Sequence, residues 1–200
     1  MCVYSDGSGI DGSAGAAAVL FWDGLEVRAI RYQLGPLTQH TTYKAEVIGV
    51  LLALELLRRE RRVHMASIKL DNQAVIQALG VCSTKPAQSL LNMVHGACEE
   101  WMAGDRQGHR QLGISWISGH DGVKGNERAD KEARKAVSDG SSPCEDLPDV
   151  LQEGPLPYSL TVLGGSFQAD LRERWKSLWA KSPQRGRMDK INANSLCLPS

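Results

Sequence analysis

The segment that most restricts how this chain can fold is residues 47–57, which is apolar nearly all round apart from Glu55. It belongs to a helix that we expect from about residue 43 to about residue 59, with Thr41 and Thr42 before it as capping residues. A surface helix has one apolar and one polar face, whereas a helix that is apolar on nearly all sides has to be buried. We therefore expect this helix to lie inside the core.

Segments with the pattern of β-strands stand on both sides of this helix in the sequence. Five strands are expected, at residues 2–5, 15–22, 25–34, 64–70 and 114–117. Further helices are expected at residues 71–79, 85–103 and 126–137. A glycine-rich turn at residues 6–9 ends the first strand, and Asp23-Gly24, a dipeptide typical of two-residue hairpins, joins the second strand to the third. The element order is then βββαβααβα, with three antiparallel strands first.

Composition limits the class of protein without naming a function. The 200 residues fit one domain of ordinary size plus an appendage. The 23 basic and 23 acidic side chains cancel, so net charge does not indicate a polyanionic partner. No apolar segment has the roughly 18 to 20 residues that a membrane span needs, and the N-terminus lacks the regions of a signal peptide. We therefore expect an intracellular protein that does not cross a membrane.

The cysteines agree with that expectation. They are Cys2, Cys82, Cys98, Cys144 and Cys197. Their number is odd, they are scattered, and no two of them form a C-x-x-C pair, which argues against a disulfide framework and against a zinc site. We interpret them as reduced thiols.

Four carboxylates stand where strands end or helices begin: Asp6, Glu46, Asp71 and Asp130. Each has an ordinary explanation by itself, since Asp6 precedes a glycine in a turn, Asp71 can cap the next helix, and the other two can be solvated helix charges. In an α/β sheet, however, the ends of adjacent strands converge at one edge. Carboxylates gathered there repel one another and raise one another's pKa unless a dication neutralises them.

Such a group of oxygen ligands selects Mg²⁺ or Mn²⁺. Two of these ions, about 4 Å apart, can activate a water on one side of a phosphodiester and stabilise the leaving oxygen on the other, as in nucleases and polymerases. No nucleophilic side chain is then needed. The four carboxylates together therefore favour metal-dependent chemistry on a phosphodiester.

Four sequence blocks occur in a specific order: YSDGSG (residues 4–9), TTYKAE (41–46), LDNQ (70–73) and SGHDGVKGNERAD (118–130). Together they resemble the motifs of type 1 ribonuclease H, and the last, with its GH-x-G-x-x-GNE-x-AD pattern, is the most distinctive. The resemblance covers residues 1–138. It implies an α/β domain with the ribonuclease H-like fold, in which a five-stranded mixed sheet of order 3-2-1-4-5 is flanked by helices. It also implies an enzyme that cuts the RNA strand of an RNA/DNA hybrid with two Mg²⁺ ions, or with Mn²⁺ in their place.

The resemblance assigns roles to single residues. The implied metal ligands are Asp6, Glu46, Asp71 and Asp130, with Asp6 placed to bridge both ions. The implied loop histidine, which assists turnover or product release, is His120. A loop histidine outside such a motif would be an ordinary solvated residue.

Contacts to the hybrid are expected beside the metal edge. A hybrid is distinguished from duplex DNA by 2′-hydroxyls in its minor groove, so short polar side chains are needed there. The candidates are Ser8, Thr42 and Gln73. By the same resemblance Thr41 would help to hold a phosphate of the DNA strand, although helix capping explains both threonines as well. Family members often have Asn where this chain has Thr42 and Tyr43, which leaves the details of hybrid contact open.

The sequence changes character after residue 138. We expect a linker over residues 139–165, because its first part is rich in Ser, Pro, Asp and Glu. A helical tail follows at 166–200, with seven basic and three acidic residues between positions 170 and 190. The tail is either an auxiliary grip on nucleic acid through its cations and the indoles of Trp175 and Trp179, or a helix that packs its apolar face on the core or on a neighbour.

Three hypotheses follow. The leading one is an active hybrid-specific endonuclease, because all four acidic ligands and His120 are present. The alternative is a catalytically inactive, nucleic-acid-binding remnant of a retroelement, since the first strand begins almost at the first residue, as in a domain cut from a longer protein. The linker and Trp-containing basic tail also resemble the C-terminal region of reverse transcriptases from non-LTR retrotransposons. A DNA nuclease or integrase of the same fold is disfavoured, because such enzymes lack the last of the four blocks.

Overall fold

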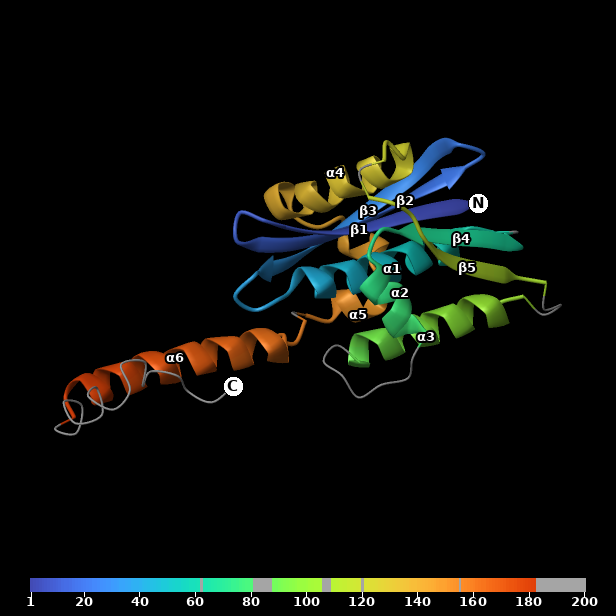
Figure 1. The fold of residues 1–200 in the computed structure, drawn as a ribbon. Coiled ribbons are helices and arrows are strands. Elements are labelled where there is room, and N and C mark those ends of the chain that lie inside the picture. The colour runs from blue at the N-terminus through green and yellow to red at the C-terminus, as the bar shows by residue number, and fades with distance from the viewer. Residues whose placement is uncertain (62, 81–87, 106–108, 120, 155, 183–200) are drawn as a thin grey trace. The chain divides into compact units, whose positions relative to one another are not determined.

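The computed structural model describes residues 1–61, 63–80, 88–105, 109–119, 121–154 and 156–182. The chain divides into two compact units, Met1–Ser159 and Leu160–Ser200. The first unit contains a five-stranded sheet with helices on both faces (Figure 1). The described part of the second unit is one helix, α6 (Leu160–Ala180). None of the helices in the described residues combines the length and the apolar character that crossing a bilayer requires.

The sheet has the strand order that the sequence predicts. Its strands are β1 (Cys2–Ile10), β2 (Ser13–Trp22), β3 (Leu25–Pro36), β4 (Met65–Leu70) and β5 (Gln111–Trp116). They lie in the order β3-β2-β1-β4-β5. β2 is antiparallel to β1 and β3, whereas β4 is parallel to β1 and β5, so the sheet is mixed. Asp23 and Gly24, both at positive φ, form the predicted hairpin tip.

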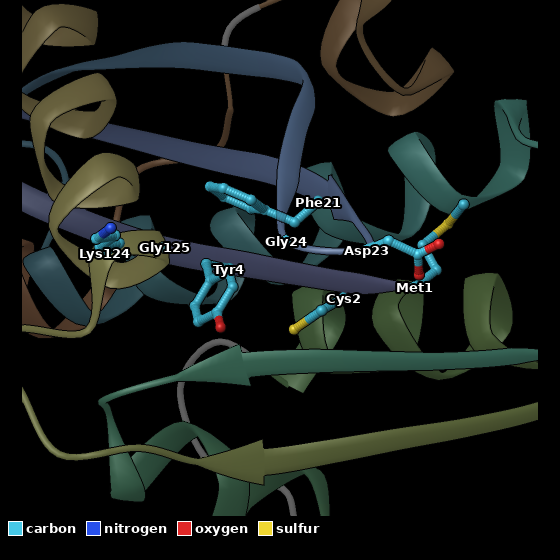
Figure 2. Close-up of a pocket in the computed structure, with 8 residues that line it drawn as sticks. All are labelled: Met1, Cys2, Tyr4, Phe21, Asp23, Gly24, Lys124 and Gly125. Atoms are coloured by element: carbon cyan, nitrogen blue, oxygen red, sulfur yellow. The ribbon is translucent and has the colours of Figure 1, made fainter.

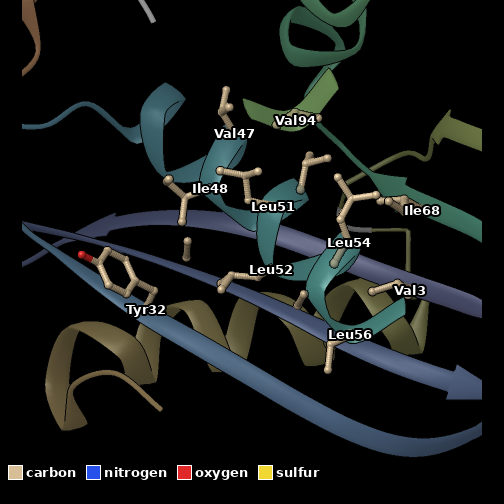
Figure 3. Packing of buried hydrophobic residues seen from close by; sticks show 14 of the residues in the cluster. Val3, Tyr32, Val47, Ile48, Leu51, Leu52, Leu54, Leu56, Ile68 and Val94 are labelled. Carbon is tan, nitrogen blue, oxygen red and sulfur yellow. The ribbon is translucent and has the colours of Figure 1, made fainter. Parts of the chain in front are cut away.

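Helices cover both faces of this sheet. They are α1 (Thr42–Arg59), α2 (Gln73–Leu79), α3 (Gln88–Ala103) and α4 (Lys124–Asp139). α1 packs on β1 and β2 with α3 behind it, and α4 packs on the opposite face (Figure 1). The prediction that α1 is buried is confirmed, because Leu52 and Leu56 have no exposed surface and lie in the centre of the core (Figure 3). Glu55 of the same helix is also buried, and Arg58 and Arg59 each pair with it at 2.7 Å.

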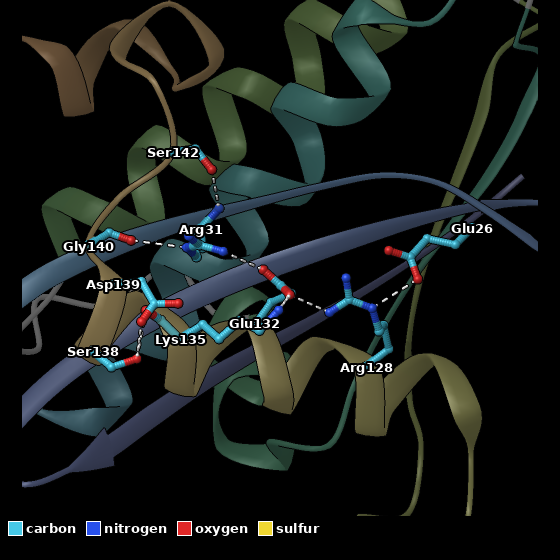
Figure 4. Close-up of polar contacts among 9 residues, drawn as sticks. All are labelled: Glu26, Arg31, Arg128, Glu132, Lys135, Ser138, Asp139, Gly140 and Ser142. Carbon is cyan, nitrogen blue, oxygen red and sulfur yellow. Dashed lines mark hydrogen bonds and ion pairs between the residues drawn. The ribbon is translucent and has the colours of Figure 1, made fainter.

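An ionic cluster fastens α4 to the sheet. Glu132 of α4 accepts hydrogen bonds from Arg31 of β3 at 2.9 Å and from Arg128 and Lys135 of its own helix (Figure 4). Burial alone raises the pKa of Glu132, but hydrogen bonds from Lys135, Arg128 and Arg31 outweigh it and lower the pKa to about 2. The carboxylate is therefore charged at neutral pH, and it links β3 to the helix that carries Asp130.

The first strand is longer than its apolar run predicts. We expected a turn at residues 6–9, but β1 continues through them to Ile10 and pairs with β2 along its whole length. The turn lies at Asp11 and Gly12, whose φ angles are 48° and 75°. Gly7 has a packing role instead, because a Cβ there would lie within 2.8 Å of three backbone atoms of α1. Glycine at position 7, which in the sequence indicates a turn, thus allows α1 and β1 to pack closely.

Of the segment that we expected to be a linker, residues 140–154 and 156–159 belong to the first unit. This part contains a 3-10 turn (Cys144–Asp146) and the short helix α5 (Asp149–Gln152). Three of its leucines are buried in the core around α1: Leu147, Leu151 and Leu156. The prediction of a linker is therefore wrong for this part of the chain, because its apolar side chains have partners in the core. We call residues 140–154 and 156–159 the C-terminal strap.

Polar contacts hold the strap at both ends of α1. At the C-terminal end, Arg59 pairs with Asp146 at 3.0 Å. At the N-terminal end, the buried ammonium of Lys44 donates to the backbone carbonyl of Pro157 and lies 3.1 Å from Nδ1 of His40. The strap therefore lies along the helix that supplies one of the predicted metal ligands.

The buried leucines of the strap predict a large effect on stability. Leu151 is 4% exposed, and we expect Leu151→Ala to lower the free energy of unfolding by about 2–5 kcal/mol, the usual cost of such a cavity. Leu25, which is 74% exposed, is the matched control, and its replacement by Ala should cost less than about 0.5 kcal/mol. Urea unfolding followed by circular dichroism measures both changes. Equal midpoints for Leu151→Ala and the wild type would mean that the strap adds nothing to the folded core.

The second unit has the apolar face expected of the tail. Phe167 and Trp175 of α6 are exposed, and the rings of Trp175 and Trp179 stack with centroids 6.2 Å apart. Arg174 pairs with Asp170 at 2.9 Å, so part of the basic cluster is neutralised within the helix. The basic positions beyond residue 182 lie outside the described residues. Both interpretations of the tail stay predictions.

Candidate metal centre

Parallel pairing brings two of the predicted ligands to one level of the sheet. The register of β1 and β4 pairs Tyr4 with Lys69. Two residues further along each chain stand Asp6, still within β1, and Asp71, just after β4 has ended at Leu70. Because the two strands run side by side in the same direction, this register places both carboxylates at the same level of the sheet, beside the C-terminal end of β4.

Asp71 does not cap the helix that follows it. Asn72 caps α2, and its side-chain oxygen accepts hydrogen bonds from the backbone N–H groups of Ala74 and Val75 at 3.1 and 3.2 Å. The carboxylate of Asp71 accepts instead from Nδ2 of Asn126 at 3.1 Å. Helix capping therefore does not explain Asp71, and its carboxylate belongs with those of Asp6 and Glu46.

Glu46 reaches this part of the sheet from just after the first turn of α1, because helix and strand lie backbone against backbone. One glycine on each side makes the crossing possible. A Cβ at Gly7 of β1 would meet the backbone of Glu46, and a Cβ at Gly49 of α1 would lie 3.1 Å from the carbonyl oxygen of Asp6. α1 thus crosses β1 at the point where the carboxylates of Asp6 and Glu46 lie close together.

Three of the four predicted ligands form a compact group. Asp6, Glu46 and Asp71 each offer a carboxylate oxygen, and these oxygens lie within 4.8 Å of one another. Asp6 is 7% exposed and Glu46 is 6% exposed. Burial, followed by the charges of Asp71 and Asp130, raises the pKa of Asp6 to about 7. Burial, followed by the charges of Asp6 and Asp71, raises the pKa of Glu46 to about 8.

One oxygen of Glu46 indicates what the group would bind. Oε2 is buried and has no hydrogen-bond partner among the described residues. A buried acceptor without a partner costs about 1–3 kcal/mol, and more when it is charged. A divalent cation would satisfy this oxygen and lower the pKa values of all the carboxylates around it. The donor set, made of carboxylate oxygens, fits a hard cation such as Mg²⁺ or Mn²⁺.

Asp130 lies close to this group without being part of its compact centre. Its carboxylate is 37% exposed and accepts a hydrogen bond from Arg134, one helical turn further along α4, at 2.9 Å. Its charge raises the pKa of Asp6, which shows that the two carboxylates are within electrostatic reach. The structure thus brings together Asp6, Glu46 and Asp71, and it places the fourth predicted ligand at their margin.

The two threonines stand at the start of α1. Thr41 is the N-cap, and its hydroxyl accepts a hydrogen bond from the backbone N–H of Lys44 at 3.1 Å. Thr42, the first residue of the helix, is exposed. The capping role predicted for Thr41 is confirmed, and a contact of either residue with substrate stays a prediction.

The remaining predicted site residues differ in accessibility. Ser8 lies two residues beyond Asp6 on the same face of β1 and is 8% exposed. Gln73 is exposed at the first position of α2. His120 lies outside the described residues.

Three further residues border Asp71 that were not among the site residues predicted from the sequence. Asn126 is 6% exposed and donates to the Asp71 carboxylate. The indole Nε1 of Trp116 donates to the backbone carbonyl of Asp71 at 3.0 Å. A Cβ at Gly119 would lie 2.9 Å from Asp71 Oδ2. Asn126 and Gly119 stand inside the GH-x-G-x-x-GNE-x-AD block, so the block itself was the available signal, whereas nothing in the sequence marks Trp116.

The raised pKa values predict how stability depends on pH and metal. Asp6 and Glu46 have pKa values of about 7 and about 8 in the folded chain, against about 4 in an unfolded chain. Between these values the folded state holds more protons, so without metal the stability falls as pH rises, and the loss is complete above about pH 8. Mg²⁺ bound to the folded state would offset that loss.

Thermal unfolding in EDTA and in Mg²⁺, from about pH 5.5 to about pH 8.5, measures this dependence. Glu46→Gln is the control, because it removes one of the two titrating groups while His40 and other groups stay the same. We expect the midpoint in EDTA to fall less steeply with pH in this variant than in the wild type. Identical slopes would contradict the electrostatic description of the group.

Comparison with known proteins agrees with this geometry. A family model described as RNase H matches residues 1–138. A ribonuclease H of Nitrosococcus oceani is 28% identical over 151 residues, which cover 69% of this chain and 94% of the relative. A ribonuclease H of an Acidovorax species (strain JS42) is 31% identical over 149 residues, 68% of this chain and 93% of the relative. LC11-RNase H1, solved in complex with an RNA/DNA hybrid, has the same fold with a TM-score of 0.52 at 18% identity, covering 69% of this chain and 96% of that one. The chain therefore belongs to the ribonuclease H family, in its type 1 form.

Proposed function

We propose that this chain is an endonuclease that hydrolyses the RNA strand of RNA/DNA hybrids at the group formed by Asp6, Glu46 and Asp71. The observation that carries the proposal is this group itself, whose carboxylate oxygens lie within 4.8 Å of one another and include a buried Glu46 oxygen without a partner. Membership of the ribonuclease H family supports the reaction. The hybrid bound to LC11-RNase H1 supports the substrate.

Asp6, Glu46 and Asp71 would hold Mg²⁺, or Mn²⁺ in its place, and Asp130 would be a fourth ligand. The resemblance to type 1 ribonuclease H implies two such ions, and Asp6, Glu46, Asp71 and Asp130 would hold them together. When bound, such a pair supplies an activated water on one side of the phosphodiester and stabilises the leaving oxygen on the other. The chain's own contribution is to hold the carboxylates together in a largely buried site, and no nucleophilic side chain is required.

Substrate contacts would come from the same edge. The start of α1 suits a phosphate, because unpaired N–H groups at a helix N-terminus favour anions, and Thr41 would help to hold a phosphate of the DNA strand there. Ser8, Thr42 and Gln73 would face the minor groove, where 2′-hydroxyls distinguish a hybrid from DNA. His120 would assist turnover or product release.

An end-labelled RNA/DNA hybrid, incubated with the full chain in Mg²⁺, tests this function. Double-stranded RNA, double-stranded DNA and an EDTA reaction are the controls. We expect metal-dependent cutting of the RNA strand of the hybrid and of no other strand. Equal cutting of double-stranded DNA would point to a DNA nuclease of the same fold. No cutting by folded protein in Mg²⁺ or Mn²⁺ would favour the inactive nucleic-acid-binding remnant. The relation to retroelement reverse transcriptases, which the linker and the tail suggest, stays a prediction.

A further inference from the structure

Asn126 has an unusual hydrogen-bonding state for a buried amide. Its side chain lies in the first turn of α4 and is 6% exposed. Nδ2 donates to Oδ2 of Asp71 at 3.1 Å, whereas Oδ1 is buried and has no partner among the described residues. The two amide atoms cannot be exchanged, because an ionised carboxylate accepts hydrogen bonds and only the nitrogen can donate one.

The fold forces Asn126 into this position. Gly125 lies directly on the ring of Tyr4, where a Cβ would come within 2.6 Å of three ring atoms. Figure 2 shows Tyr4 of β1 and Gly125 at the start of α4 lining the same pocket. The backbone N–H of Asn126 is fixed by the carbonyl of Val123 at 2.9 Å. The first turn of α4 is therefore seated on the central strand, and Asn126 reaches from it to the end of β4.

The unpartnered oxygen calls for a donor from outside the chain. Buried polar atoms in folded proteins nearly always have a hydrogen-bond partner, and leaving one unpaired costs free energy. Oδ1 and Nδ2 are bonded to the same carbon atom, so Oδ1 is also near Asp71, although it points away from the hydrogen bond that Nδ2 makes. The carboxylates of Asp6, Glu46 and Asp71 are acceptors when ionised and cannot satisfy it. A water of a cation's hydration shell can, because it donates hydrogen bonds and is brought to this place by the ion.

We propose that Asn126 is a positioning residue of the metal centre, and this proposal rests on the proposed function. Nδ2 holds Oδ2 of Asp71 on the side that Gly119 closes, which leaves the other oxygen of Asp71 to the ion. Oδ1 would accept a hydrogen bond from a water of the hydration shell of the Mg²⁺ that Asp6, Glu46 and Asp71 would hold. Asn126 thereby raises the affinity of the centre for its metal without being a ligand itself.

Mg²⁺ binding without nucleic acid separates this role from a structural one. Calorimetric titration of the full chain with Mg²⁺ should show binding weakened about 10- to 100-fold in Asn126→Leu, the effect typical of residues that orient metal ligands. In EDTA the same variant should unfold at a temperature close to that of the wild type, because at similar volume the removal of the unsatisfied buried oxygen offsets the loss of the hydrogen bond to Asp71. Asn92→Leu, an exposed position on α3, is the control and should bind Mg²⁺ as the wild type does. If leucine prevents folding, Asn126→Ala removes the amide with a smaller side chain and should weaken Mg²⁺ binding similarly.

Cleavage of the hybrid gives an independent measurement. The Mg²⁺ concentration for half-maximal rate should rise about 10-fold or more in Asn126→Leu, with the KM for the hybrid unchanged at saturating Mg²⁺. A variant that unfolds earlier in EDTA yet binds Mg²⁺ as tightly as the wild type would overturn the proposal and leave Asn126 a packing residue. Failure of the wild type itself to bind Mg²⁺ would overturn the proposed function as well, so the two failures are distinguishable.

Discussion

Asp71→Asn should abolish cleavage of the RNA strand while the chain keeps its fold and its affinity for the hybrid. The substitution removes one charge from the group of three carboxylates and hardly changes volume. A metal ligand contributes several kcal/mol of transition-state stabilisation, so we expect the rate to fall on the order of 10³-fold or more. Single-turnover cleavage in Mg²⁺ measures the rate, and a gel-shift titration of the hybrid in Ca²⁺ measures binding.

The same variant should be more stable than the wild type in EDTA. The charge of Asp71 contributes to the raised pKa values of Asp6 and Glu46, so removing it relieves repulsion in the metal-free chain. Asp23→Asn is the matched control, because it removes one negative charge at a hairpin tip where Asn tolerates positive φ, and it should leave both cleavage and stability unchanged. Cleavage by Asp71→Asn at the wild-type rate would refute the assignment of Asp71 as a metal ligand.

Gly7→Ala should damage stability and activity together. The added methyl group would lie within 2.8 Å of three backbone atoms of Ala45 and Glu46, and backbone cannot move aside as the end of a flexible side chain can. Overpacking of this kind costs about 1–3 kcal/mol and sometimes more, and we expect the upper end of that range. Because α1 must shift away from β1, Glu46 should leave its place beside Asp6, and cleavage should fall even at temperatures where the variant is folded.

Gly113→Ala is the control for this effect. Gly113 also lies in a strand, β5, but the nearest atom to a Cβ there is 4.0 Å away, which is ordinary contact. Denaturant unfolding and hybrid cleavage should be close to wild type in this variant. If Gly7→Ala behaved like Gly113→Ala, the close crossing of α1 and β1 would not be what positions Glu46.

The fold was largely predictable because its main signals are local. The apolar character of residues 47–57 required a buried helix, and Asp23-Gly24 marked a hairpin. The end of β1 was missed because a glycine needed for close packing, Gly7, looks the same in a sequence as a glycine needed for a turn. The strap was missed because its leucines stand among Ser, Pro and acidic residues, and only the folded core shows that Leu147 and Leu151 are buried.

The candidate site was predictable to the extent that motifs carry it. The blocks that resemble type 1 ribonuclease H identified Asp6, Glu46 and Asp71, which the structure brings together. Their environment depends on contacts between distant segments, which no local pattern encodes. The bond from Asn126 to Asp71 joins residues 55 positions apart in the sequence, and the burial of the Glu46 carboxylate depends on how two backbones cross.

Anomalous X-ray scattering from crystals of the full chain soaked in Mn²⁺ tests most directly the claim that Asp6, Glu46 and Asp71 form a divalent-metal centre. We predict a strong peak at bonding distance, about 2.0–2.6 Å, from oxygens of all three carboxylates, and a weaker or absent peak in Glu46→Gln crystals. No peak at this group, or a peak bound by other acidic residues while this group stays empty, would contradict the account.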